Sequence, residues 1–397
     1  MDLDRRGFLK VAGLTALSAS LPSLALPPSV LADDKKKKNP GERYKTKRVI
    51  VVAFAGGVRS RETIGSPDNI PNIMKLAQEG VILPHVATRN VGHYGAAMSI
   101  FTGQVEEKGI RENERVESPT VFEYVRKQRS LEAKDVWLST SGGDQQLNYA
   151  YGTHADYGAK FGANLIGGDG VFNAEFKGLL EHFGRPRTDD KKERERLDAL
   201  RAALDDAQVK NRVPGSEAEV TNDPQTRSRI ERFILDELTG STTNLTGPGS
   251  GDARAIRIAK NILGVFRPTL LGIALSNADV AHGSFNGYVE VIRRNDQELG
   301  ALWAAVQADP ELKGTTSIFV LPEFGRDHDL NQRQGLDHGD SSKDLSEIAC
   351  IAAGPDFKQN QVVTDEVRWT QVCPTVCELL GAASEKTKEK RLEAVFA

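Results

Sequence analysis

Short runs of apolar residues recur along the chain, separated by intervals long enough to hold a helix. The clearest run is Val49–Phe54, in which every residue is apolar and which leads into Gly56 and Gly57. An uninterrupted run of this length predicts a strand buried on both faces, as in a parallel sheet, followed by a glycine-rich turn. Further strands of this kind are expected at 81–83, 135–139, 268–275, 316–321 and 348–353.

Helical periodicity fills the first of these intervals. From Pro71 to Ala77 the apolar residues Ile73, Leu76 and Ala77 fall on one face, and Gly80 ends the segment before the next strand. Strands that alternate with helices predict an α/β fold in three layers. We therefore expect a sandwich with a mostly parallel central sheet between two layers of helices.

The segment 185–251 has a different composition. Residues 189–210 are dense in charge around one apolar stripe, and residues 226–238 carry a second stripe at helical spacing. Residues 241–251 are rich in Ser, Thr, Asn and Gly, which is typical of a loop. We expect a helical insertion on the main domain, which either shapes a substrate cleft or an oligomer contact or is a solvated helical hairpin.

The N-terminal segment has the layout of an export signal. Arg5 and Arg6 stand before Phe8, an apolar stretch with three prolines follows, and residues 30–32 offer a cleavage site. This predicts a cleaved twin-arginine signal peptide at 1–32 and a protein that works in the periplasm or outside the cell. The less favoured alternatives are a buried N-terminal helix or an uncleaved anchor, although a membrane helix needs about 20 unbroken apolar residues. Membrane contact is thus expected only during export.

The remaining boundaries follow from charge and apolar content. Residues 33–46 contain the basic run Lys35–Lys38 flanked by acidic residues, which is typical of a solvated linker. The α/β domain is expected at 47–384 and a C-terminal tail at 385–397. The formal net charge of −3 gives no reason to expect nucleic-acid binding, and the sequence does not indicate an oligomeric state.

The three cysteines are too few and too poorly spaced for a disulfide framework. Cys350 lies in an apolar run that predicts a buried strand. Cys373 and Cys377 are one helical turn apart, so they form either a metal pair or part of a packed core. The core is favoured, because a free cysteine behaves as a small hydrophobic residue.

Polar residues gather where the predicted strands end, which is the edge at which ligands bind in open α/β sheets. Three such turns follow the strands that end at Leu83, Leu275 and Leu321. Imidazole and carboxylate ligands together suit Zn²⁺, Mn²⁺ or a similar ion. A single histidine carries little weight, but these turns hold five of the seven histidines: His85, His93, His282, His328 and His338. The pattern indicates a divalent-metal site at this edge.

Four segments, at 49–57, 70–81, 93–103 and 373–381, resemble the alkaline phosphatase superfamily, which includes sulfatases, phosphodiesterases and phosphoglycerate mutases. The likeness covers most of residues 47–381 apart from the insertion. It implies the alkaline phosphatase-like α/β fold. The Glu-Phe-Gly-Arg turn that ends at Arg326, followed by an Asp-His pair, further resembles a sulfatase-like branch exported by the twin-arginine pathway.

Carried over residue by residue, the resemblance implies one complete metal site and one eroded site. The second metal site of the superfamily is the eroded one. In this chain Ala55 stands where that site has its first aspartate, and Glu323-Phe324 stand where an Asp-His pair is usual. No Cys, Ser or Thr occupies the nucleophile position, where Asn90–Gly92 stand. The Cys-x-Pro-x-Arg motif needed for formylglycine is absent from the sequence, so ordinary sulfatase chemistry is not expected. The complete site consists of Asp279, His282 and His338.

The resemblance and the strand-end clusters together imply a metal-dependent hydrolase of phosphate or sulfate esters. One divalent ion, Zn²⁺, Mn²⁺ or Ca²⁺, would activate water without a covalent intermediate. The expected substrate is an anionic ester of a small molecule or a polysaccharide.

Roles for the other polar residues follow from their chemistry. Arg326 and Arg59 would offset charge on the ester oxygens, and Asn90 would help to bind substrate. Glu323 would act as a general base or a further ligand, and His93 as a proton carrier. For Arg326, a salt bridge with a neighbouring aspartate of its own turn is an equal alternative.

Two other interpretations remain open at this stage. The protein could be a non-catalytic member of the fold that acts in binding or structure, since the nucleophile is missing. Alternatively, Glu62 or Asp337 could replace a lost ligand and restore a second ion. Metal stoichiometry separates the three interpretations. The single-site hydrolase predicts roughly one ion per chain, the non-catalytic protein none and the rearranged site two.

Overall fold

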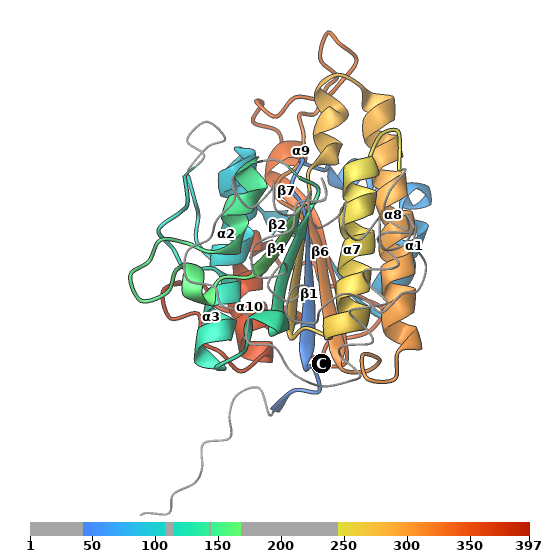
Figure 1. The fold of residues 1–397 in the computed structure, drawn as a ribbon. Coiled ribbons are helices and arrows are strands. Elements are labelled where there is room, and N and C mark those ends of the chain that lie inside the picture. The colour runs from blue at the N-terminus through green and yellow to red at the C-terminus, as the bar shows by residue number, and fades with distance from the viewer. Residues whose placement is uncertain (1–42, 108–113, 143, 168–244) are drawn as a thin grey trace, which may run out of the picture. The chain divides into compact units, whose positions relative to one another are not determined.

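The computed structural model describes residues 43–107, 114–142, 144–167 and 245–397. Within these residues the strands form one sheet in the order β4-β3-β5-β1-β6-β7-β2-β8, with β9 beside β2 (Figure 1). The strand bounds are β1 Arg48–Phe54, β2 Gly80–Ala87, β3 Val136–Thr140, β4 Asn164–Gly167, β5 Leu270–Leu275, β6 Thr316–Pro322, β7 Glu347–Ala353, β8 Gln361–Val362 and β9 Val367–Arg368.

The sheet is mostly parallel, as the sequence predicted. Strand β1 pairs in parallel with β5 and β6, and β3 pairs in parallel with β4 and β5. Strand β7 is antiparallel to both of its neighbours, β6 and β2. The carboxyl ends of the parallel strands therefore meet at one edge of the sheet.

Helices cover both faces of the sheet. Figure 1 shows α1, α7 and α8 on one side and α2, α3 and α10 on the other. The helix bounds are α1 Pro71–Gln78, α2 His93–Thr102, α3 Val121–Gln128, α7 Ser250–Phe266, α8 Phe285–Ala308, α9 Lys343–Ser346 and α10 Val372–Leu379. Short 3₁₀ helices lie at Ser60–Glu62, Pro67–Asn69, Ala133–Asp135, Asp144–Ala150, Ala159–Phe161, Asn277–His282, Trp369–Gln371 and Glu393–Val395.

The alternation of side chains along β1 explains the three layers. Ile50 and Val52 point into the core that contains α1, α7 and α8. Val49 and Val51 point into the core that contains α2, α3 and α10. Because successive side chains of a strand point to opposite faces, an all-apolar strand requires cover on both sides. Each such side chain contributes about 1.5–3 kcal/mol by leaving water.

Two glycines let the turn after β1 approach its neighbours. A Cβ at Gly56 would lie 2.6 Å from the carbonyl oxygen of Ser276 and 2.8 Å from the backbone nitrogen of Asp279. Gly57 has φ +64°, which favours glycine. The turns that follow β1 and β5 can therefore pack backbone against backbone.

Most sequence-based expectations for the fold are confirmed. The six predicted strands correspond to β1, β2, β3, β5, β6 and β7. The short strands β4, β8 and β9 were not predicted, because two to four residues carry too little periodicity. The cysteines Cys350, Cys373 and Cys377 are free and buried, as core packing predicted.

Some expectations lie outside the described residues or need correction. The signal peptide 1–32, most of the linker 33–46 and most of the insertion 185–251 are not among the residues described. Helix α7 begins at Ser250, so the predicted loop ends slightly earlier. The expected tail 385–397 is part of the domain, because Leu392 and Val395 are buried in the core. None of the helices in the described part of the chain combines the length and apolar character needed to cross a membrane.

Candidate metal centre

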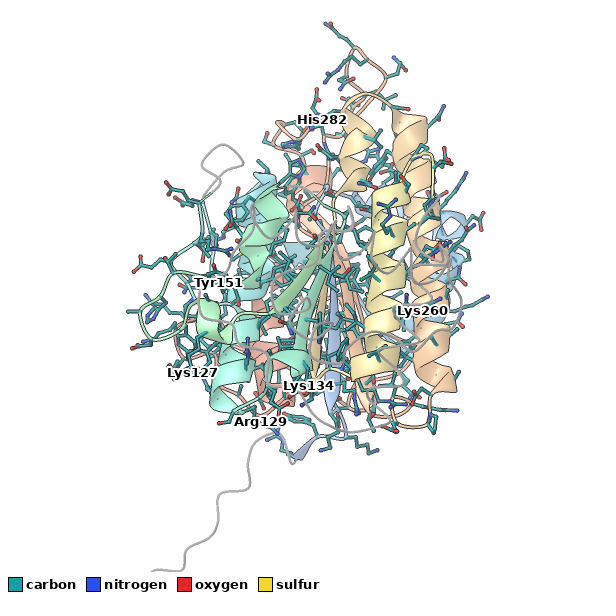
Figure 2. All side chains as sticks on the ribbon, in the orientation of Figure 1. Lys127, Arg129, Lys134, Tyr151, Lys260 and His282 are labelled. Carbon is teal, nitrogen blue, oxygen red and sulfur yellow. The ribbon has the colours of Figure 1, made fainter. Side chains whose placement is uncertain are left out.

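Four side chains that can bind a metal converge at the carboxyl edge of the sheet. Asp279 and His282 lie in the 3₁₀ helix that follows β5, and His338 lies in the loop between β6 and α9. His93 is the first residue of α2. Figure 2 shows His282 at the end of the domain opposite Lys134, which stands just before β3.

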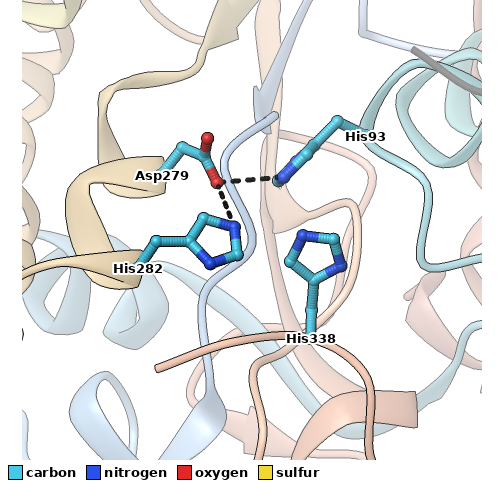
Figure 3. Close-up of side chains that lie close together, drawn as sticks. All are labelled: His93, Asp279, His282 and His338. Atoms are coloured by element: carbon cyan, nitrogen blue, oxygen red, sulfur yellow. Dashed lines mark ion pairs between the residues drawn. The ribbon is translucent and has the colours of Figure 1, made fainter. Parts of the chain in front are cut away.

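The four side chains are close enough to share one ion. One ligand atom from each of them lies within 4.8 Å of the ligand atoms of the other three (Figure 3). The Oδ1 of Asp279 is 3.0 Å from Nε2 of His93 and 3.3 Å from Nε2 of His282. The ring of His338 lies 4.8 Å from the ring of His93 and 4.9 Å from that of His282, measured between centroids.

The chemistry of this cluster fits a divalent cation. Three imidazole nitrogens and one carboxylate oxygen form a donor set typical of zinc and also acceptable to manganese. Nε2 of His93 is buried and has no well-directed hydrogen-bond partner in the described residues, although Asp279 lies within ion-pair distance. A buried nitrogen of this kind is costly unless something occupies its lone pair or its proton. The three predicted ligands are therefore brought together, with His93 beside them.

Two carboxylates stand behind the imidazoles. Oε1 of Glu323, whose side chain is fully buried, lies 2.5 Å from Nδ1 of His93. Oδ1 of Asp337 lies 2.6 Å from Nδ1 of His282. A carboxylate on one ring nitrogen holds the proton there and leaves the other nitrogen facing the site. Glu323 and Asp337 thus aim the Nε2 atoms at the cluster.

The charges of the cluster shift the pKa values of its members in opposite directions. Burial disfavours a charged His93, but the charges of Glu323 and Asp279 outweigh burial and raise its pKa to about 9. Burial would raise the pKa of Asp279, yet His93 and Arg326 hold it well below its usual range. Burial, which His93 offsets only in part, raises the pKa of Glu323.

His338 behaves in the opposite way. Burial and the positive charges of His93, Arg326 and His282 lower its pKa to about 4. The imidazole of His338 is therefore neutral at neutral pH, which is the form that binds a metal.

The two arginines predicted at the site have internal partners. The guanidinium of Arg326 pairs with Asp279 at 2.6 Å, rather than with an aspartate of its own turn. Arg59 donates from Nε and one terminal nitrogen to the two carboxylate oxygens of Glu62, and from the other terminal nitrogen to two backbone carbonyls. This arrangement does not support the substrate-binding role predicted for Arg59.

Asn90 also has local partners. Its Oδ1 accepts a hydrogen bond from the backbone nitrogen of Gly92 at 2.8 Å, and its Nδ2 donates to the carbonyl of Glu106. It therefore shapes the turn before α2, and its role in substrate binding stays a prediction. The two hydroxyl residues nearest the expected nucleophile position bond to backbone carbonyls, Thr88 to Ser346 and Ser99 to Gly95.

The residues that the resemblance assigns to a second metal site are apolar or have other partners. Ala55 is buried, and the ring of Phe324 packs 5.0 Å from His93 and 5.1 Å from His338, between centroids. Glu62 is held by Arg59, and Asp337 stands behind His282 rather than at a separate site. Within the described residues, the structure thus supports one metal site rather than a rearranged pair.

The sequence placed His93 and Glu323 at this edge of the sheet but gave no sign of their contacts. His93, for which proton transfer is predicted, also lies within the ligand cluster, and its role stays a prediction. Glu323 was expected to reach substrate or metal, although it is fully buried behind His93. The one signal in the sequence was that both residues lie in turns at the ends of predicted strands. Their pairing could not be predicted, because they are 230 positions apart in the chain.

Comparison with models of protein families found no match, and comparison with curated proteins found none either. Solved structures do match. The alkaline phosphatase PafA has a TM-score of 0.57 at 11% identity, over 89% of this chain and 99% of that chain. The 2-O GAG sulfatase BT1596 has a TM-score of 0.51 at 11% identity, over 87% of this chain and 73% of that chain. The PsFucS1 sulfatase from Pseudoalteromonas sp. has a TM-score of 0.50 at 12% identity, over 88% and 71%.

These similarities define the class of the fold. The chain has the α/β fold of the alkaline phosphatase superfamily, as the sequence resemblance predicted. At identities of 11–12% the likeness concerns the fold, and function has to be argued from the site itself. The more specific expectation, a sulfatase-like branch exported by the twin-arginine pathway, stays a prediction.

Proposed function

We propose that this protein is an exported, metal-dependent hydrolase of phosphate or sulfate esters. The observation that carries the proposal is the cluster of His93, Asp279, His282 and His338 at the carboxyl edge of the sheet. An alkaline phosphatase and two sulfatases share this fold. The expected substrate is an anionic ester, because a cationic centre attracts the ester oxygens.

The residues of the cluster divide into ligands and a proton carrier. We assign Asp279, His282 and His338 to the ion, as the resemblance implies. When bound, the ion would activate a water molecule and polarise an ester oxygen. Nε2 of His93 would exchange a proton with the reacting groups, while Glu323 holds Nδ1 of the same ring at 2.5 Å.

The alternative is a non-catalytic protein in which the metal has a structural role. The observation in its favour is that a ring nitrogen of His93 lies within 4.8 Å of the ligand atoms of Asp279, His282 and His338, so His93 can serve as a fourth ligand. Four protein ligands close a tetrahedral site, whereas a catalytic site keeps one position open. Ala55 and Phe324, which are apolar where the superfamily is expected to have metal ligands, agree with this alternative.

Metal content and ester hydrolysis separate the two functions. Mature protein is analysed for bound metal and assayed with p-nitrophenyl phosphate and p-nitrophenyl sulfate. We expect roughly one ion per chain and metal-dependent hydrolysis of one of the esters. His338→Ala should lose both. His328→Ala is the matched control, because His328 is exposed and bonds to Asp344 outside the cluster.

The outcomes lead to different conclusions. Bound metal without hydrolysis of any ester tested supports the structural alternative. Absence of metal from the wild-type protein refutes a metal-dependent function altogether. Equal metal loss in His338→Ala and His328→Ala places the ion elsewhere.

Export is a separate part of the proposal, and it rests on Arg5 and Arg6. Replacement of both arginines by lysine should retain the full-length precursor inside the cell, since paired arginines mark the pathway. Fractionation of cells that express either form tests this. Equal amounts of processed protein outside the cytoplasm in both cases would contradict it.

A further inference from the structure

Arg326 is a fully buried arginine in direct contact with the metal cluster. A buried guanidinium is expensive unless each of its donors is paired. We infer that Arg326 is a positioning residue, whose guanidinium holds the ligand Asp279 and the turns around it in place for binding of the ion. The inference rests on the metal site of the proposed function and is independent of the ester that is hydrolysed.

Four N–H groups of this guanidinium have an oxygen acceptor in the protein. Nε donates to the carbonyl of Gly57 at 3.3 Å, and one terminal nitrogen lies 3.3 Å from the carbonyl of Leu336 and 3.2 Å from Nε2 of His282. The other terminal nitrogen donates to the carbonyl of Gly56 and, at 2.6 Å, to Oδ1 of Asp279. A guanidinium has about five donors. The remaining N–H faces Nε2 of His282, whose single lone pair would bind the ion, so at most this one donor is left for an ester oxygen.

These acceptors belong to the three segments that meet at the site. Gly56 and Gly57 form the turn after β1, and Asp279 lies in the turn after β5. Leu336 stands two residues before His338. One rigid, planar side chain therefore ties the ligand-bearing turns to one another and to the end of β1.

The backbone around Arg326 is built for close approach. A Cβ at Gly57 would lie 2.9 Å from Nε of Arg326. A Cβ at Gly325 would lie 1.7 Å from the carbonyl oxygen of Asp344, whose neighbour Leu345 accepts a hydrogen bond from Gly325 at 2.8 Å. The position of the guanidinium is thus set by close backbone contacts on both sides.

Charge and geometry predict opposite effects for the loss of Arg326. Its positive charge repels a divalent cation, so charge alone predicts tighter metal binding without it. Its hydrogen bonds orient the ligands, so geometry predicts weaker binding. Arg326→Lys separates the two effects, because lysine keeps the charge but has only about three donors and no plane.

The test is a zinc titration of the mature protein in competition with a chelating dye. Arg326→Lys should lower zinc affinity by about 10–100-fold, the range found for residues that support metal ligands. Arg59→Lys is the matched control. Arg59 is also buried and satisfied by a carboxylate and backbone carbonyls, but it contacts none of the four cluster residues. The affinity of the Arg59→Lys variant for zinc should equal that of the wild type.

Each outcome has a defined meaning. Wild-type or tighter zinc binding by Arg326→Lys overturns the inference, as does an equal loss of affinity in Arg59→Lys. If Arg326→Lys does not fold, Arg326→Gln is titrated instead. If neither variant folds without metal, the zinc concentration needed to restore the fold is measured. A variant that folds at the concentration that saturates the wild type overturns the inference, and a variant that needs at least about tenfold more zinc supports it. A wild-type protein that binds no zinc refutes the proposed metal site rather than the role of Arg326.

Discussion

The buried carboxyl of Glu123 should make the stability of the protein depend on pH in an unusual direction. Glu123 is the third residue of α3 and forms a capping box with Thr120. Its oxygens also accept hydrogen bonds from the backbone nitrogens of Gly152 at 2.8 Å and Gly158 at 2.6 Å. Burial outweighs these hydrogen bonds and raises the pKa of Glu123 from 4.5 to about 7.

The size and sign of the effect follow from this pKa. Between about pH 4.5 and 7 the folded protein keeps a proton that the unfolded chain has lost. The stabilisation associated with Glu123 is therefore fully present below the unfolded pKa and disappears as the pH rises through the folded pKa. A pKa difference of one is worth about 1.36 kcal/mol, so the total change is on the order of 3 kcal/mol.

The perturbation is Glu123→Gln, which keeps the shape and removes the titration. Urea unfolding of both proteins, with chelator present to remove metal, gives the free energy of unfolding at several values between about pH 4.5 and 8. The value for the wild type minus that for Glu123→Gln should fall by about 3 kcal/mol over this range, while the contributions of other groups cancel. A difference that stays constant or rises with pH would show that the hydrogen bonds outweigh burial, and would refute the reasoning.

Three further predictions concern the metal centre. His93→Ala should keep its metal and lose ester hydrolysis by about 10²–10⁴-fold, the contribution of a proton carrier; loss of the metal instead would make His93 a fourth ligand. Asp337→Asn should lower zinc affinity by about tenfold in a dye competition, because it weakens the hold on Nδ1 of His282; unchanged affinity would contradict that role. Gly56→Ala should destabilise the protein by about 1–3 kcal/mol in urea, because its Cβ would lie 2.8 Å from the backbone nitrogen of Asp279; an unchanged midpoint would show that the turn can move.

Much of the fold follows from local patterns in the sequence. Val49–Phe54 is apolar at every position, and the structure places it at the centre of the sheet between two cores. The convergence of Asp279, His282 and His338 was also predictable, because they follow parallel strands whose carboxyl ends share one edge.

The contacts of the site required the tertiary structure. The sequence placed His93, Glu323 and Arg326 correctly at the carboxyl edge of the sheet. It did not show that Glu323 pairs with His93 or that Arg326 donates its hydrogen bonds to acceptors within the protein. Their partners are 47 to 230 positions away along the chain. Arg59 illustrates the same limit, since its pairing with Glu62 depends on a local turn that carries no periodicity.

The physical reason is a difference in range. The sequence by itself determined which segments are strands and helices and which turns carry the ligands, because apolar periodicity acts over neighbouring residues. Only the tertiary structure decided the antiparallel direction of β7, the pairing of His93 with Glu323 and the internal role of Arg326. These depend on how closely separate turns approach, which is set by strand register and by glycines such as Gly56 that permit backbone contact.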